Sequence, residues 1–151
     1  MLEYPCQRIY RDARITSIYE GTTQLQVVAA IRYVTTGAYL NIIKEFEAIP
    51  LSAEMEELKN RVKEMACKYG ACVNQVTEAK DQEYLDFVAR RLVEMAADII
   101  MCHLVMQDAT NAPELFAKSA NVYVNYAEAE VEKHFNFIRK FSAEQLDNYR
   151  Q

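Results

Sequence analysis

Two repeats of apolar side chains in the middle of the chain constrain its fold more than any other feature. In each repeat, apolar residues recur at alternating steps of three and four. The first repeat, in residues 52–78, consists of Met55, Leu58, Val62, Met65, Tyr69, Cys72 and Val76. The second, in residues 81–109, consists of Leu85, Val88, Leu92, Met95, Ile99, Cys102 and Met106. This spacing places one apolar stripe along a helix. Because only a short polar link separates the two segments, we expect an antiparallel helical hairpin.

Two further long helices are expected on either side of this hairpin. The first covers residues 24–47 and is weakened locally by Gly37, because glycine is a poor helix former. Its expected apolar face consists of Val28, Ile31, Val34 or Thr35, Ala38, Ile42 and Phe46. The second runs from Pro113 to about residue 139, with Asn111 as its cap. Its expected core face consists of Phe116, Ala120, Tyr123, Ala127, Val131 and Ile138.

Local signals predict where the remaining elements begin. Residues 1–9 are expected to form a loop and residues 10–19 a short helix, and Ser52 is the expected N-cap of the helix that follows it. Two pairs match the capping-box pattern of a helix start, Thr23 with Gln26 and Ser142 with Gln145. The second of these pairs opens a short terminal helix.

The composition agrees with a helical chain. Only 3 Gly and 3 Pro occur among 151 residues, which leaves little room for the turns of a sheet protein. Four long helices joined by short links predict an all-α fold. The expected architecture is an up-down four-helix bundle, preceded by an N-terminal loop and short-helix segment.

The net charge and the hydropathy of the chain limit the binding partners and the cellular compartment that we expect. The net charge is −5, and no basic face indicates a nucleic-acid partner. Arg8, Arg11 and Arg14 form one local cluster, which can bind phosphate or form ion pairs with acidic neighbours. No apolar run reaches the roughly 20 residues of a membrane span, no helix has the faces of a membrane-surface helix, and no signal peptide is visible. We therefore expect a protein of the bacterial cytoplasm or an organelle matrix, neither secreted nor bound to a membrane.

The histidines and cysteines do not predict a metal site. A di-metal bundle needs glutamate three residues before each ligand histidine, but Ile100 precedes His103 and Val131 precedes His134 at that distance. Both histidines are therefore expected to be packing or surface residues. No cysteine pair has metal-like spacing. We expect the four cysteines, Cys6, Cys67, Cys72 and Cys102, to be reduced thiols in or near the core.

One segment near the N-terminus differs from these helical patterns, because polar, aromatic and glycine residues converge in it. Glu20 lies between Tyr19 and Gly21, at the junction of a loop and a helix. A carboxylate covered there by an apolar ligand would have a raised pKa and could accept a carbon-bound proton. Backbone N–H groups beside Gly21 could stabilise a developing enolate oxygen. The alternative is a glutamate in a surface turn.

The same segment carries a resemblance to a known family. The run is Glu3-Tyr4-Pro5-x-x-Arg8-x-Tyr10-Arg11-Asp12-Ala13-Arg14-Ile15, followed by Ile18-Tyr19-Glu20-Gly21-Thr22-Thr23-Gln24-Leu25-Gln26. It resembles the carboxy-terminal signature of the acyl-CoA dehydrogenases over about residues 3–34. The match is long, ungapped and rich in unusual residues, which makes it specific.

The resemblance implies a flavoenzyme that oxidises an acyl-CoA thioester to the trans-2-enoyl-CoA. Glu20 would be the base that removes the α-proton, and Gly21 would lie against the acyl-CoA. Thr22, Thr23 and Gln24 would contact FAD. The family also implies an electron-transferring flavoprotein as electron acceptor and a homo-oligomer. A branched, aromatic or glutaryl thioester stays open as the substrate.

The resemblance further implies how the chain is organised. Residues 1–47 would form the C-terminal catalytic segment with its long helix, and residues 48–151 a helical extension packed with it in one bundle. The family's amino-terminal helical domain and central β-domain would precede this segment, so the chain alone is expected to be inactive. The alternative function is a helical interaction or dimerisation module without activity of its own.

Overall fold

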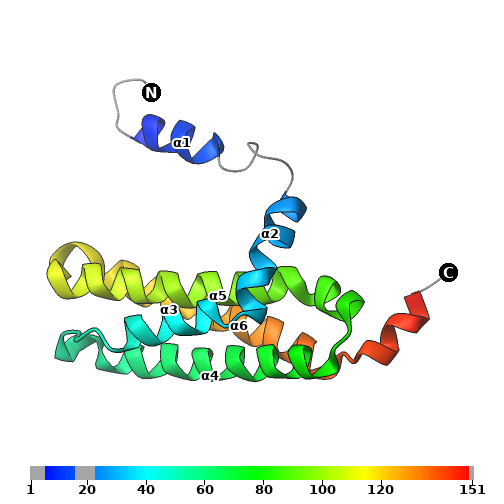
Figure 1. The fold of residues 1–151 in the computed structure, drawn as a ribbon. Helices are drawn as coiled ribbons and strands as arrows, with labels where there is room; N and C mark the ends of the chain where they lie inside the picture. The colour runs from blue at the N-terminus through cyan, green and yellow to red at the C-terminus, as the bar shows by residue number, and fades with distance from the viewer. Residues whose placement is uncertain (1–5, 16–22, 150–151) are drawn as a thin grey trace.

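The computed structural model describes residues 6–15 and 23–149, and this part of the chain is helical without any strand. The elements are α1 (Cys6–Ile15), α2 (Thr23–Thr35), α3 (Ala38–Glu47), η1 (Ala53–Met55), α4 (Glu56–Ala79), α5 (Gln82–Asn111), α6 (Pro113–Lys140) and η2 (Ala143–Tyr149). Helices α3 to α6 run alternately up and down along one bundle (Figure 1). The predicted all-α bundle is therefore confirmed.

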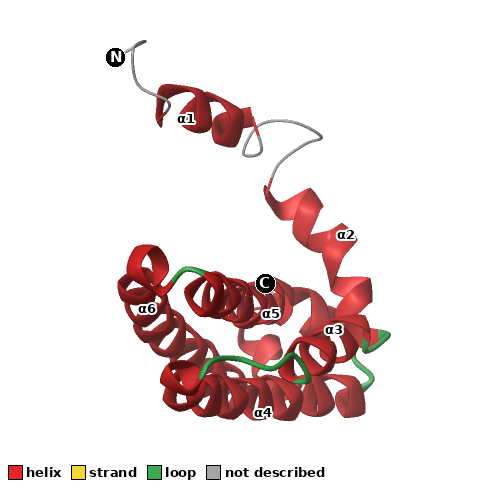
Figure 2. Ribbon diagram, turned by 90° about the vertical axis from the view of Figure 1, so that its left-hand side faces the viewer, coloured by secondary structure: helices red, strands yellow, loops and turns green. Residues whose placement is uncertain are grey.

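Helices α4 and α5 form the centre of this bundle. Both of them contact α3 and α6, and the view along the bundle shows α3 and α6 on opposite sides of this pair (Figure 2). Every residue of the two apolar repeats is buried, except Leu85, which is partly buried. The predicted antiparallel hairpin is confirmed, and its two helices contribute most of the buried core residues.

Helix α6 is held against the hairpin by apolar and polar contacts. Ala120, Ala127, Val131 and Ile138 are buried as predicted, but Phe116 is exposed. At its end, the Tyr84 hydroxyl donates to the carbonyl oxygen of Phe141 at 2.9 Å. This bond satisfies a carbonyl that a helix end leaves without an intrahelical partner.

The prediction of one continuous helix over residues 24–47 is wrong. Helix α2 ends at Thr35, and Gly37 turns the chain with φ 75° and ψ 7° before α3 begins. Glycine adopts this left-handed conformation without the steric cost that other residues bear. Because the two halves point in different directions, their apolar faces also shift: Val27 and Ile43 are buried in place of Val28 and Ile42.

Several predicted helix ends also differ from the structure. Helix α1 already begins at Cys6, and Asn111 is the last residue of α5, so Ala112 precedes α6. Ser52 precedes η1, but its side chain makes no capping hydrogen bond.

Other helix starts agree with the sequence. Pro113 does occupy the start of α6. Gln145 accepts a 3.0 Å hydrogen bond from the Ser142 N–H, as in a capping box. The other predicted box depends on the side chain of Thr23, which lies outside the described part of the structure.

A pair of leucine substitutions tests the assignment of the core. Leu92 is fully buried on α5, whereas Leu115 on α6 is 68% exposed. We expect Leu92→Ala to lower the free energy of unfolding by about 2–5 kcal/mol, because it removes buried methyl groups and leaves a cavity. The same change at Leu115 should cost less than about 0.5 kcal/mol. Urea unfolding followed by circular dichroism measures both, and equal losses would contradict the assignment.

Candidate functional site

The residues predicted to carry the chemistry precede or open α2. Glu20, Gly21 and Thr22 lie outside the described residues. Thr23 and Gln24 are the first two residues of α2, and only their backbone is described. Their proposed roles therefore stay predictions, and the structure contributes the helix that follows them.

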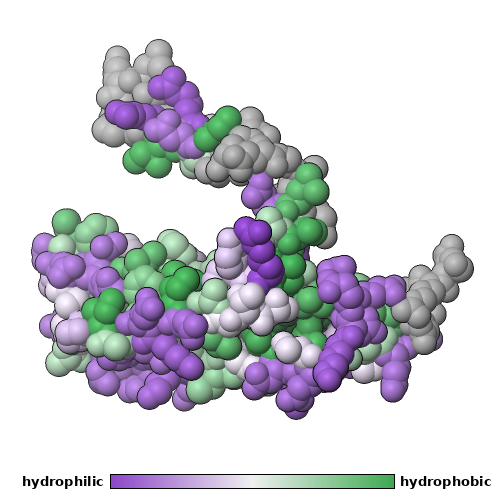
Figure 3. All heavy atoms as spheres, in the orientation of Figure 1, coloured by the Kyte–Doolittle hydropathy of each residue, from purple (hydrophilic) through white to green (hydrophobic). Residues whose placement is uncertain are grey.

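Helix α2 leaves the bundle at an angle (Figure 1). Val27, Ile31 and Val34 are buried, and α2 packs chiefly on α5. On other sides of the helix, Leu25 and Val28 are 58% and 54% exposed. Figure 3 shows this apolar surface on the projecting helix. Helix α2 is thus held to the bundle along the face that carries Val27, Ile31 and Val34.

The first turn of α2 can donate hydrogen bonds to electron-rich atoms of a ligand. The first turn of a helix presents N–H groups without intrahelical partners and the positive end of the helix dipole. The first turn of α2 contains no acidic residue that would compete for these groups. Hydroxyl and amide side chains, as in the run Thr22-Thr23-Gln24, add donors of the kind that bind the polar edge of a flavin. The contact of these three residues with FAD stays a prediction.

His103 is a core residue of α5. It is buried, its ring is stacked on Phe46 with a centroid distance of 5.8 Å, and its Nε2 atom has no hydrogen-bond partner. Burial, with a smaller effect of Lys59, lowers the pKa of His103 to about 4. The side chain is therefore neutral near pH 7 and packs as an aromatic ring, which is one of the two roles that the sequence left open.

His134 lies in a charged cluster between α5 and α6. Its Nε2 atom is 3.2 Å from the nearer Glu94 carboxylate oxygen and 3.9 Å from that of Glu130. Each carboxylate also has a cationic partner, Arg90 for Glu94 and Lys133 for Glu130. Burial lowers the pKa of His134, and Glu94 opposes this shift.

The sequence did not predict this cluster as a whole. The pairing of Glu130 with His134 is visible as a spacing of four residues, but Glu94 lies on another helix.

Within residues 6–15 and 23–149, no group of three acidic, histidine or cysteine side chains is arranged to hold a metal ion.

Next to this cluster, a carboxylate and a phenol are paired. The Tyr123 hydroxyl lies 3.0 Å from an Asp98 carboxylate oxygen and donates a hydrogen bond to it. Burial raises the pKa of Asp98, and the bond from Tyr123 opposes the shift. The pair joins α5 to α6, which gives it a structural role in holding these helices together.

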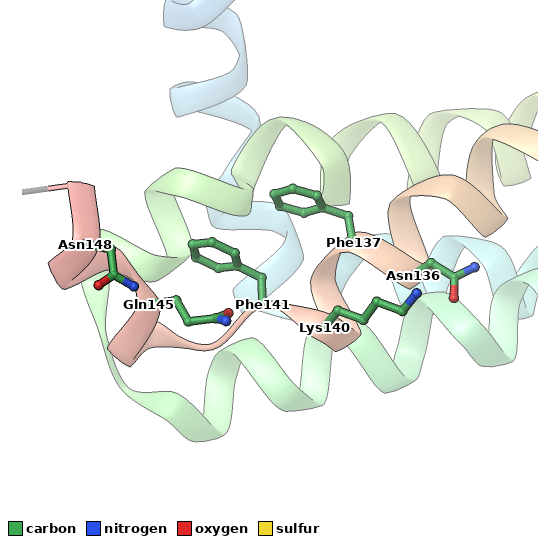
Figure 4. A pocket seen from close by; sticks show the side chains of 6 residues that line it. All are labelled: Asn136, Phe137, Lys140, Phe141, Gln145 and Asn148. Atoms are coloured by element: carbon green, nitrogen blue, oxygen red, sulfur yellow. The ribbon is translucent and has the colours of Figure 1, made fainter.

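A hollow of about 390 Å³ lies where α6 meets η2 (Figure 4). Phe137 and Phe141 contribute rings to it, and Lys140, Gln145, Asn136 and Asn148 contribute polar groups. The two rings are nearly parallel at 5.6 Å, and the guanidinium carbon of Arg91 lies 3.8 Å from the Phe137 centroid. The contact of Arg91 with Phe137 joins α5 to α6 beside this hollow.

The cysteines divide into two classes. Cys72 and Cys102 are buried, and burial raises their pKa values to about 11 and about 12. They are inert thiols in the core, as predicted. Cys6 and Cys67 are exposed, so the prediction that they lie in or near the core is wrong.

The N-terminal arginine cluster contains at least one ion pair. Arg8 Nε lies 3.6 Å from an Asp12 carboxylate oxygen, one helical turn further along α1. Both side chains are exposed, so this pair contributes little to stability.

Among the helices of residues 6–15 and 23–149, none has the length and apolar character that a membrane span needs.

The comparisons with known proteins agree with this geometry. Residues 35–146 match the family described as acyl-CoA dehydrogenase C terminal. The solved structure of the acyl-CoA dehydrogenase family protein from Porphyromonas gingivalis is 42% identical in sequence, with a TM-score of 0.71. The match covers 76% of this chain and 98% of that one. The chain belongs to the acyl-CoA dehydrogenase C-terminal family.

A curated relative matches a much shorter stretch. It is the acryloyl-CoA reductase (NADH) of Anaerotignum propionicum, which is 53% identical over 34 residues. These residues make up 22% of this chain and 9% of the relative. The chain therefore spans only a small part of the length of this enzyme.

The low pKa of His103 predicts how stability depends on pH. The ordinary pKa of about 6.5 applies to the unfolded chain, whereas the folded value is about 4. Between these values the unfolded chain binds a proton that the folded chain does not bind, so stability is full above pH 6.5 and falls as the pH is lowered towards 4. We expect His103→Phe to remove this part of the pH dependence while keeping the ring beside Phe46.

Urea unfolding at half-unit pH steps measures the effect. The carboxylates titrate in both proteins, so the difference between the two curves isolates His103. Parallel curves between pH 6.5 and 4 would contradict the assignment.

Proposed function

We propose that this chain is the C-terminal part of a flavin-dependent acyl-CoA dehydrogenase. The observation that carries the proposal is the run Tyr19-Glu20-Gly21-Thr22-Thr23-Gln24, which resembles the family's catalytic signature. A match to the family's C-terminal domain begins 11 residues after Gln24 (35 − 24), at residue 35. Residues 1–47 would then contribute the catalytic segment, and residues 48–151 the helical extension that packs with its last helix.

In the proposed reaction, Glu20 acts as a general base. Its carboxylate takes the proton from the α-carbon of the acyl thioester, and the backbone N–H of Glu20 donates to the thioester carbonyl oxygen. That hydrogen bond stabilises the negative charge that develops on the oxygen as the proton leaves. FAD, when bound, supplies the acceptor for the β-hydride, so that the substrate loses two electrons and two hydrogens to become the trans-2-enoyl-CoA.

The residues after Glu20 bind and orient. Gly21 has no side chain, so the backbone can approach the acyl-CoA closely. In this proposal, Thr22, Thr23 and Gln24 would hold FAD by donating hydrogen bonds to it. The absence of acidic residues in the first turn of α2 supports that role.

The curated relative favours a second candidate function. Its name describes an enzyme that reduces acryloyl-CoA with NADH. The same residues serve that reaction in reverse: Glu20 gives its proton to the α-carbon while the β-carbon receives a hydride. Assays with an acyl-CoA and an electron acceptor, and with an enoyl-CoA and NADH, distinguish the two directions.

Other properties of the proposed enzyme follow from its family. We expect an electron-transferring flavoprotein as the electron acceptor in the oxidative direction and a homo-oligomeric enzyme. The bacterial cytoplasm or an organelle matrix is the expected compartment. The family match favours this enzymatic role over a separate interaction module.

Replacement of Glu20 tests the assignment of the base. In the enzyme that contains this segment, we expect Glu20→Gln to slow the reduction of FAD by acyl-CoA at least about 100-fold, because an amide cannot accept the α-proton. Stopped-flow absorbance of the flavin measures this rate. Glu54→Gln, the same change at an exposed position of η1, is the matched control and should leave the rate unchanged. Undiminished flavin reduction in Glu20→Gln would show that the base is another residue.

A further inference from the structure

We propose that the helical bundle positions the segment that contains Glu20, through the packing of α2 on α5 and the left-handed turn at Gly37. Ile31 and Gly37 are then positioning residues for Glu20. This inference rests on the proposed function, because it assumes that Glu20 is the base. It assigns to the C-terminal bundle a role in catalysis that neither the family match nor the fold by itself supplies.

Helix α2 is attached to the bundle by one buried apolar stripe. Its three buried residues, Val27, Ile31 and Val34, recur at steps of four and three and therefore form a single stripe along the helix. This stripe packs on α5, with smaller contacts to α3 and α4. A helix attached along one stripe is fixed in its rotation about its own axis as well as in its position. The first residues of α2 are fixed with it.

Only a short stretch of chain separates the proposed base, Glu20, from α2. Glu20 is three residues before Thr23, the first residue of α2. Three residues span at most about 11 Å of chain. The position and direction of the start of α2 therefore limit where Glu20 can be. A small displacement of a catalytic group is costly, since misplacement by about 1 Å can slow a reaction about 100-fold.

The turn at Gly37 sets the direction of α2. The turn is fixed by hydrogen bonds on both sides of Gly37: its N–H donates to the Val34 carbonyl oxygen at 3.1 Å, and its own carbonyl oxygen accepts from the Asn41 N–H at 3.0 Å. Tyr33 and Tyr39 make an edge contact across the turn, with ring centroids 6.0 Å apart. The turn thus has one defined geometry, and it sets the angle at which α2 leaves the bundle.

Glycine is required at position 37 because of its backbone conformation, and not because a side chain would lack room there. A Cβ atom at position 37 would have no heavy atom within 4 Å apart from its chain neighbours. Alanine would therefore fit sterically, but it disfavours a φ of 75° and favours a right-handed helix. Because residues 24–47 otherwise have the pattern of one helix, alanine should straighten α2 and α3 into a continuous rod. That would remove the stripe of α2 from α5.

A matched pair of substitutions at Gly37 tests the turn in the 151-residue chain. Asparagine tolerates the left-handed conformation much better than alanine does. We expect Gly37→Ala to reduce the hydrogen-exchange protection of the amides of residues 27–34 at least tenfold, and Gly37→Asn to keep most of it. Circular dichroism shows that both variants are folded. Equal protection in the two variants would overturn the role of the turn.

A second pair of substitutions tests positioning in the enzyme that contains this segment. Ile31→Ala removes an anchor of α2, whereas Ile138→Ala makes the same change at a buried position of α6. We expect Ile31→Ala to lower kcat at least tenfold with KM changed less than twofold, because binding of the substrate is retained while the base is displaced. Ile138→Ala should lower the unfolding temperature and leave kcat unchanged. Ile31→Val, with one methylene fewer, should give a smaller fall in kcat and guards against failure to fold.

The outcomes separate this inference from the proposed function. If Glu20→Gln is inactive and Ile31→Ala has the kcat of the parent enzyme, the positioning role is wrong and the base assignment stands. If Glu20→Gln keeps full activity, the proposed function itself fails. An equal fall in kcat for Ile31→Ala and Ile138→Ala would overturn the inference, because it would show a general effect of stability.

Discussion

The burial of apolar side chains between α4 and α5 is the interaction on which the rest of the structure depends. Both helices present seven-residue repeats to this interface, and both contact α3 on one side and α6 on the other. A fully buried aliphatic side chain contributes about 1.5–3 kcal/mol, whereas an exposed or partly exposed ion pair, such as Arg61 with Glu128, contributes about 0–1 kcal/mol. The apolar seam therefore contributes more to the stability of the bundle than the ion pairs between its helices do.

The position of α2 connects this bundle to the proposed chemistry. The helix begins next to the residues that resemble the catalytic signature, and it ends at the turn from which α3 enters the bundle. Its buried stripe lies on α5, one of the two central helices. A rigid central pair is a suitable support for a catalytic segment, because a group on a well-packed element is placed more accurately than one on a free loop.

Only part of the candidate site was open to prediction from the sequence. The run around Glu20 was found through its resemblance to a family, because a glutamate beside a glycine has by itself no spacing that identifies a base. The sequence left His103 open as a packing or a surface residue, and only the structure shows its burial, which lowers its pKa and keeps it neutral. The contact of His134 with Glu94 was not predicted, because it joins residues on two helices whose relative rotation is set by packing. The exposed Cys67 was misassigned because it lies next to the apolar stripe of α4 and yet outside it.

The sequence by itself determined the helical class, the three long helices α4, α5 and α6, and the central hairpin. Spacings of three and four residues act within a few turns of one helix, so they can be read without knowing its neighbours. Only the tertiary structure decided the direction of α2. Glycine adopts right-handed and left-handed conformations at similar cost, so local preference at Gly37 allows both a straight helix and a turn. The packing of Val27, Ile31 and Val34 on α5 selects the turn, because a straight helix would leave that apolar stripe in water.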